Sequence, residues 1–231
     1  MRRVITISLL CFAQALISQS SLTEIKRNIY QNLNSSVNQN YIRLINEGMT
    51  SDGSNEYFAF EDWTEFQVES QEGDLINLDS ANYHIHDDIM LFIDEGAMFF
   101  LFPEQVDRIY ADDMVFTSYK HEKNKYNYFE ILAQGEFQLL KKYKVIKERV
   151  VDNPLGITHG TQEYTFKRKP EYYYYDVIKE QINRVPKKKK DLIRIFKKNK
   201  SKMLDFARLN KLNSKSEEDL ITLFDYYNQL N

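Results

Sequence analysis

The stretch EFQVESQEGDLINL, residues 65–78, decides the fold class of this 231-residue chain. Phe66, Val68 and Ser70 alternate with charged or amide side chains, which is the period of a strand with one buried face. Glu72-Gly73-Asp74 is typical of a tight turn, and the apolar residues from Leu75 onward begin a return strand. The stretch therefore predicts an antiparallel hairpin.

Further short segments follow this hairpin at intervals of about 8–12 residues, with turn residues between them. Strands are expected at Tyr83–His86, Ile89–Ile93, Met98–Phe102, Val106–Tyr110, Met114–Tyr119, Tyr126–Ala133, Glu136–Val145, Thr161–Arg168 and Tyr172–Tyr175. The five apolar residues of Met98–Phe102 favour a fully buried central strand. The pattern predicts an α+β fold built on an antiparallel β meander or barrel-like sheet.

Helical periodicity flanks this region on both sides. Ser21-Leu22-Thr23-Glu24 is a capping-box pattern that opens an N-terminal helix. Beyond Pro186 apolar residues recur at helical spacing, and Ser216 is expected to cap the last helix. We expect a signal peptide at 1–18, an N-terminal helical segment at 19–50, a β-rich domain at 51–185 and a semi-independent C-terminal helical appendage at 186–231.

The first residues indicate an exported protein. Met1-Arg2-Arg3 is basic, Val4–Ile17 is uncharged and mostly apolar, and Ser18-Gln19-Ser20 is small and polar, which is the pattern of a signal peptide. The expected location is periplasmic or secreted. Cys11 is the only cysteine, so a processed chain has none to form a disulfide. No second apolar stretch approaches the length of a membrane span, so no transmembrane segment is expected in the mature chain.

Composition excludes several classes of protein. The 15 Phe, 16 Tyr and one Trp can bury far more surface than a disordered chain could. Seven glycines leave little room for a glycine-rich phosphate loop. The chain lacks GxSxG, HExxH, P-loop and GxGxxG motifs, and no cofactor is expected.

Charge is segregated along the chain. Residues 51–119 contain 17 acidic side chains and one basic side chain, whereas residues 141–211 contain 21 basic and 8 acidic ones. The simpler interpretation, which we favour, is that the two blocks pair within one fold. The other is that one block faces a partner, such as another envelope protein or an anionic surface. Nucleic acid is not an expected partner of an exported acidic chain.

His84, His86, Asp87 and Asp88 are the candidate metal ligands. Residues i and i+2 of a strand share a face, so both imidazoles could reach one ion, and either aspartate could add a carboxylate. A solvent-facing strand followed by an acidic turn explains the same residues. The acidic pairs Asp87-Asp88, Asp94-Glu95 and Asp112-Asp113 similarly fit either a calcium site or ordinary turns.

Lys187, Lys188, Lys189 and Lys190 are a candidate binding patch. Four lysines at the start of a helix oppose its dipole, and such a local conflict can mark an anion-binding surface. A solvated helix start is the simpler interpretation, which we favour.

Several short segments, in their order along the chain, carry a resemblance to a group of proteins. They are Tyr57–Trp63, Tyr83–His86, Phe102–Asp107, Tyr128–Leu132, Gly135 with Leu139–Tyr143, Lys188–Leu192, Glu217–Leu220 and Tyr226–Asn228. In these segments the chain resembles uncharacterised exported β-rich proteins of the Bacteroidota. The resemblance implies a location and an architecture, but no activity and no functional residue.

The sequence thus predicts an exported soluble binding or scaffold protein. The alternative is a periplasmic or secreted hydrolase with dispersed carboxylates, whose separation a sequence does not reveal. A deep cleft holding two convergent acids would favour the hydrolase, whereas a filled core beside a charged face would favour binding.

Overall fold

The computed structural model describes residues 57–94, 97–121, 125–149 and 164–230. The strands are β1 (Thr64–Ser70), β2 (Leu75–His84), β3 (Ile89–Asp94), β4 (Ala97–Leu101), β5 (Val106–Ala111), β6 (Met114–Lys120), β7 (Tyr126–Ala133), β8 (Phe137–Arg149), β9 (Tyr164–Asp176) and β10 (Gln181–Arg184). The helices are α3 (Lys189–Ile195), α4 (Lys200–Leu209) and α5 (Glu217–Gln229), with 3-10 turns η2 (Pro103–Gln105) and η4 (Lys197–Asn199). The β-rich α+β class is confirmed. The expected signal peptide and the N-terminal helical segment lie outside the described residues.

The ten strands form one antiparallel sheet in the order β10-β9-β8-β7-β6-β5-β1-β2-β3-β4. Two meanders, β1 to β4 and β5 to β10, are joined where β5 pairs with β1. The predicted first hairpin is confirmed, since Glu69 lies opposite Leu75 across the turn. Gly73 in that turn has φ +86°, a conformation that glycine adopts without steric cost.

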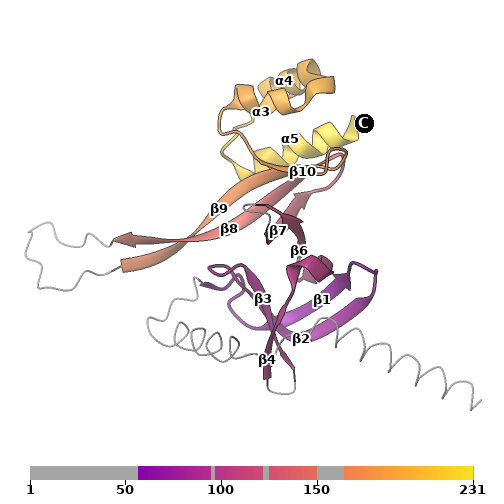
Figure 1. The fold of residues 1–231 in the computed structure, drawn as a ribbon. Helices are drawn as coiled ribbons and strands as arrows, with labels where there is room; N and C mark the ends of the chain where they lie inside the picture. Colours follow the sequence, from indigo (N-terminus) through magenta and orange to yellow (C-terminus); the bar gives the residue numbers. More distant parts are fainter. Residues whose placement is uncertain (1–56, 95–96, 122–124, 150–163, 231) are drawn as a thin grey trace, which may run out of the picture.

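The sheet curls so that its inner face encloses a core (Figure 1). Period-2 alternation directs Phe66 and Val68 of β1 and Tyr128 of β7 into one buried cluster. Tyr143 and Val145 of β8 pack against the same cluster, although β8 and β1 are separated by three strands in the sheet. The half of the sheet that contains β8 therefore approaches the half that contains β1 across this core.

The three helices cover the inner face of β7 to β9 near the β7–β8 turn (Figure 1). Phe137 and Leu139 of β8 share a buried cluster with Phe196, Phe224 and Tyr227 of the helical region. The helices and the sheet thus have a common core. The semi-independence of the region at 186–231 stays a prediction. Within the described ranges, no helix is long and apolar enough to cross a membrane.

The C-terminal helix is also attached to the β7–β8 turn by one side chain. Asn228 of α5 accepts a hydrogen bond from the backbone N–H of Phe137 at 3.2 Å. Its amide group donates to the backbone oxygens of Gln134 and Phe137, both at 2.9 Å. Gly135, at the centre of the turn, has φ +144° and leaves the space that the Asn228 side chain occupies. The turn therefore requires glycine for both conformation and room.

Three details of the predicted strands are corrected. Met98–Phe102 is not a central strand, because β4 ends the sheet order and its Met98, Phe99 and Phe100 are half-buried. The two strands expected between residues 161 and 175 are one strand, β9, which continues through Pro170. Strand β10 was not expected at all. It pairs with Tyr173–Asp176 only and does not extend as far as Pro170. The β9–β10 pairing therefore needs no hydrogen bond from the N–H that proline lacks.

Candidate functional site

Asp88, in the turn between β2 and β3, is bonded to β7 and β8 in the other half of the curled sheet. Its Oδ1 accepts hydrogen bonds from the Tyr83 hydroxyl at 2.7 Å and from the backbone N–H of Tyr128 at 3.2 Å. Its Oδ2 accepts from Asn127 at 2.5 Å and from the ammonium group of Lys142 at 3.0 Å. The Asp88 side chain is 14% exposed and its φ is 60°, a left-handed turn conformation that aspartate tolerates. We call these five residues the Asp88 clasp.

The four residues expected to hold a metal are divided between different contacts. The buried His84 lies with Nδ1 3.1 Å from the Asp87 carboxylate, whereas Asp88 belongs to the clasp. His86 is exposed and its ring meets the edge of Tyr57. Among the described residues, no three His, Cys, Asp or Glu side chains gather closely enough to hold a metal ion. The structure thus gives the predicted metal site no geometric basis.

One of the other acidic turns, at Asp112, has a local structural role. Asp112 has φ 51° in the β5–β6 turn and accepts a hydrogen bond from the Thr64 hydroxyl. Glu95 lies outside the described residues. Asp112 therefore fits the turn interpretation.

A groove of about 310 Å³ lies beside the Asp88 clasp. One wall is the β2–β3 turn, and the other is the hairpin formed by β8 and β9. Its lining combines aromatic, basic, acidic and apolar side chains. They are Ile85, His86, Asp88, His121, Asn127, Lys142, Tyr143, Lys144, Val145, Glu171 and Tyr173. Because the clasp bonds β2 and the β2–β3 turn to β7 and β8, the two walls are joined to each other before any ligand arrives.

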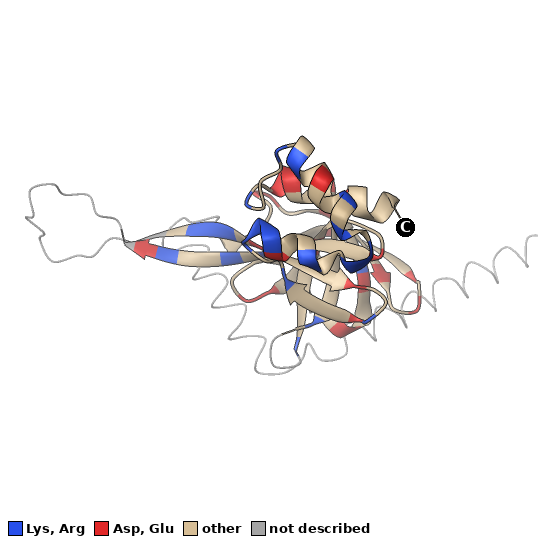
Figure 2. Cartoon of the chain, turned by 90° about the horizontal axis from the view of Figure 1, so that it is seen from above, with Lys and Arg blue, Asp and Glu red and all other residues tan. Residues whose placement is uncertain are grey.

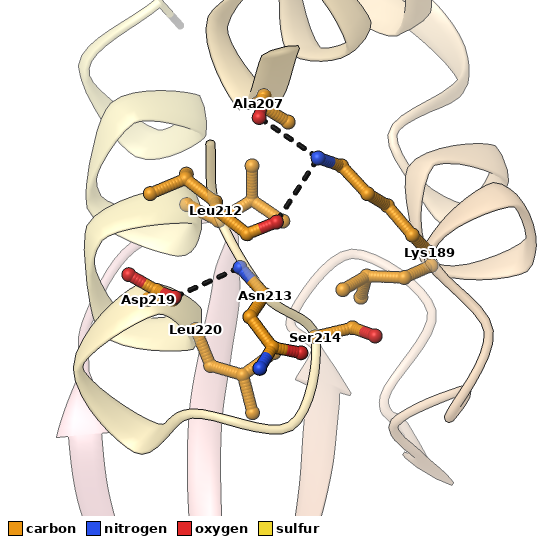
Figure 3. Close-up of a pocket in the computed structure, with 9 residues that line it drawn as sticks. Lys189, Ala207, Leu212, Asn213, Ser214, Asp219 and Leu220 are labelled. Atoms are coloured by element: carbon orange, nitrogen blue, oxygen red, sulfur yellow. Dashed lines mark hydrogen bonds between the residues drawn. The ribbon is translucent and has the colours of Figure 1, made fainter. Parts of the chain in front are cut away.

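The lysine patch at 187–190 is divided by the fold, because one of its members, Lys189, is bound within the helical region (Figure 3). Lys189 donates to the backbone oxygen of Ala207 at 2.8 Å and to that of Leu212 at 3.0 Å. These carbonyl groups lie at the C-terminal end of α4, where a positive charge is favourable. Lys189 thus has a structural role, because it supplies hydrogen bonds to the carbonyl groups at the end of a neighbouring helix. Lys187, Lys188 and Lys190 remain exposed.

Within the described ranges, few ion pairs join the acidic block of the sequence to the basic block. Among the described residues, one recorded ion pair, Lys142 with Asp88, joins the block at 51–119 to the block at 141–211. Other basic residues find acids near them in the chain, as Lys167 does with Glu148 at 2.7 Å. Figure 2 shows basic residues along the extended β8–β9 hairpin. Much of the positive charge is therefore displayed on this hairpin.

A second polar cluster lies between the two cores of the inner face. The ammonium group of Lys141 is 3.0 Å from Glu130 on β7 and 3.2 Å from Glu217 on α5. The Tyr143 hydroxyl donates to Glu130 at 2.6 Å, and that of Tyr172 donates to Glu217 at 2.9 Å. We call these five residues the Lys141 network. It fixes the first turn of α5 against the sheet.

Burial and neighbouring acids shift the pKa values of these polar groups. Burial, and then Asp88, raise the pKa values of Tyr83 and Tyr128 well above 10.0. Burial, and then Glu130, raise the pKa of Tyr143. Burial alone would lower the pKa of Lys141, but Glu130 and Glu217 raise it above its ordinary value. All four groups therefore keep their protons in the folded protein at pH values where the unfolded chain loses them.

These shifts predict a loss of stability at alkaline pH. A raised pKa stabilises the fold fully below the unfolded-state value, near pH 10 for tyrosine, and that contribution is lost as pH rises further. Tyrosine absorbance at 295 nm, followed with circular dichroism, should show exposed phenols titrating first and buried ones only as the sheet unfolds. A single reversible titration of all 16 tyrosines with the sheet intact would contradict this burial.

Sequence reasoning singled out Asp88 but assigned it to a metal, and it did not connect the other groove residues. His121, Lys144 and Glu171 come from three different strands or their ends. Only the register of β8 with β9 and the curvature of the sheet bring them together. The sequence contained one local signal of this site, Asp88 itself: it is an aspartate in a turn, and aspartate tolerates the left-handed backbone found there.

Comparison with protein-family models, with curated proteins and with solved structures found no match to this chain.

Proposed function

We propose that this protein is an exported, non-catalytic binding protein whose groove beside the Asp88 clasp holds a segment of an oligosaccharide. The observation that carries the proposal is the groove itself, because its two walls come from distant parts of the chain and are fixed together by the clasp. A preformed site loses less conformational entropy on binding than a flexible one does.

The chemistry of the lining suits a sugar. Sugar hydroxyl groups both donate and accept hydrogen bonds, and the groove offers donors such as Lys144 together with acceptors such as Glu171. Val145, which is half-buried, adds apolar surface that fits the C–H face of a pyranose ring. Ligand sites commonly combine such apolar walls with a few polar groups that fix orientation.

The hydrolase alternative has weaker support. Glu130 and Glu217 are convergent carboxylates, but both contact Lys141 and each accepts a tyrosine hydroxyl. Neither belongs to the lining of the groove. In the groove itself, Asp88 already accepts four hydrogen bonds. These acids are engaged in holding the fold, which favours binding over hydrolysis.

The test is binding of defined oligosaccharides measured by saturation-transfer NMR. The panel contains maltotriose, cellotriose, galactotriose and trigalacturonate. His86→Trp should fill the mouth of the groove and reduce transfer to the bound sugar severalfold. Leu75→Trp is the matched control, because Leu75 is 55% exposed at the other end of β2. Equal transfer to His86→Trp and to wild-type protein, or no binding of any sugar in the panel, would refute the proposal.

A further inference from the structure

Two lysines face each other across the β8–β9 hairpin next to the groove. Lys144 of β8 lies directly opposite Lys169 of β9 in the strand register. Because strand side chains alternate, both lie on the outer face that also carries Lys142, Glu171 and Tyr173. Lys144 and Lys169 are exposed, and Lys144 also lines the groove.

Like charges directly opposite each other in a sheet are destabilising. Within the part of the chain that the structure describes, neither ammonium group has an ion-pair partner. The nearest acids on this face are engaged elsewhere. Asp88 pairs with Lys142, and Glu171 pairs with Arg184 at 2.7 Å and accepts from the Tyr173 hydroxyl at 3.2 Å. The chain therefore keeps an uncompensated pair of positive charges at the edge of a preformed groove.

We propose that Lys144 and Lys169 bind the acidic group of an anionic oligosaccharide, either a carboxylate or a sulfate ester, while its sugar ring lies in the groove. This inference rests on the proposed function and names the class of its ligand. Opposite side chains in an antiparallel pair have Cβ atoms about 4.5–5.5 Å apart, so two flexible lysines can both reach one anion. The anion replaces the repulsion between the two lysines with two charge-assisted hydrogen bonds.

The position of the pair favours an acidic sugar over a nucleic acid. Single-stranded nucleic acids are bound in extended positive grooves with aromatic platforms for successive bases. Here the unpaired charge is one pair of lysines, and the adjoining groove also contains the carboxylates of Asp88 and Glu171. These carboxylates disfavour a closely spaced polyanion, whereas a sugar bears its charges one ring apart.

The experiment is isothermal titration calorimetry at about 150 mM salt, where long-range attraction is screened. The ligands are trigalacturonate for the carboxylate, a carrageenan-derived sulfated oligosaccharide for the sulfate ester, and galactotriose as the neutral analogue. Lys144→Gln and Lys169→Gln should each weaken binding of the preferred acidic ligand about tenfold, the usual scale for a charge-assisted hydrogen bond. The matched controls are Lys188→Gln and Lys190→Gln, which remove the same charge from exposed lysines in the C-terminal region.

Thermal unfolding gives a second measurement, in which the lysine variants should gain stability although they lose binding. Removing either lysine relieves the cross-strand repulsion, so Lys144→Gln and Lys169→Gln should raise the melting temperature by about 1–2 °C. Lys169→Glu should raise it at least as much, because it creates an opposite-charge pair with Lys144, and it should abolish binding of the acidic ligand. A residue needed only for stability would instead lower the melting temperature when replaced.

Each outcome is decisive. If galactotriose binds as tightly as the acidic sugars and the lysine variants change nothing, the groove proposal stands and this inference is refuted. Equal losses in the Lys188→Gln and Lys190→Gln controls would mean that binding reflects overall charge and would also refute it. Tighter binding of a 12-residue oligodeoxythymidine or of poly-glutamate would overturn the ligand class. If no sugar binds to wild-type protein, both proposals fail.

Discussion

Replacing Gly135 with alanine should lower the free energy of unfolding by about 3–5 kcal/mol, the combined scale of backbone strain and overpacking. At φ +144° the new side chain is strained, and its Cβ would lie 2.7 Å from the Cβ of Asn228. Carbon atoms in contact are normally about 3.5–4.0 Å apart. Relief requires Asn228 to move, and the three hydrogen bonds between α5 and the β7–β8 turn would then be lost. Urea unfolding monitored by circular dichroism measures the change.

Gly73→Ala is the matched control for this prediction. Gly73 also has a positive φ, but a Cβ there meets nothing within 4 Å. Its cost should be limited to backbone strain, about 1–2 kcal/mol. In a double-mutant cycle, Gly135→Ala with Asn228→Ala should cost less than the sum of the single changes, because removing the amide removes the two closest contacts of the new Cβ, those with Cγ and Oδ1 of Asn228, and leaves only the contact with its Cβ. Equal costs at the two glycines, or additive costs in the cycle, would show that Asn228 does not occupy this space.

Lys141→Met should be comparably destabilising, at about 3–5 kcal/mol, because it leaves two acids without a counter-charge. The side chains of Lys141 and Glu130 are only 11% and 9% exposed, so water cannot replace the lost ammonium group. The same urea experiment measures the loss at pH 7.

The comparison for this variant is Lys167→Met. Lys167 approaches Glu148 at 2.7 Å, closer than Lys141 approaches either acid, but both side chains of the Lys167–Glu148 pair are well exposed. The unfolding midpoint should scarcely change, because solvent screens an exposed pair. Combining Lys141→Met with Glu130→Gln and Glu217→Gln should recover part of the lost stability. A Lys141→Met protein as stable as wild type at pH 7 would show that the Lys141 network does not hold α5 to the sheet.

The strands could be predicted because their evidence is local. Alternation around Phe66 and the turn at Glu72–Asp74 specify a hairpin without reference to the rest of the chain. The cap of α5 is equally local, since the Ser216 hydroxyl accepts a hydrogen bond from the backbone N–H of Asp219 three residues later. Strand β10 was missed because its sequence, QINR, is short and mostly exposed and so lacks the apolar alternation of a buried strand.

The position of each strand in the sheet could not be predicted in the same way. Met98–Phe102 has the composition of a buried strand, yet β4 lies at the end of the sheet order. Apolar content reports how much surface a segment can bury, not which strands lie beside it. The groove could not be predicted from the sequence for a related reason. Lys144 and Lys169 are 25 positions apart, and only the β8–β9 register makes them neighbours.

The seam between β1 and β5 has a consequence for how the chain folds. Among the ten described strands it is the one pairing that joins strands not adjacent in sequence. Every other pairing joins consecutive strands with at most 14 residues between them, the most being between β8 and β9. The seam instead pairs Ser70 with Val106 and must wait until the segment between them has been organised. Contacts between distant residues slow folding, so formation of this seam is expected to limit the rate. Weakening it, for example at Ile109, should slow refolding, whereas weakening the β9–β10 hairpin should mainly accelerate unfolding.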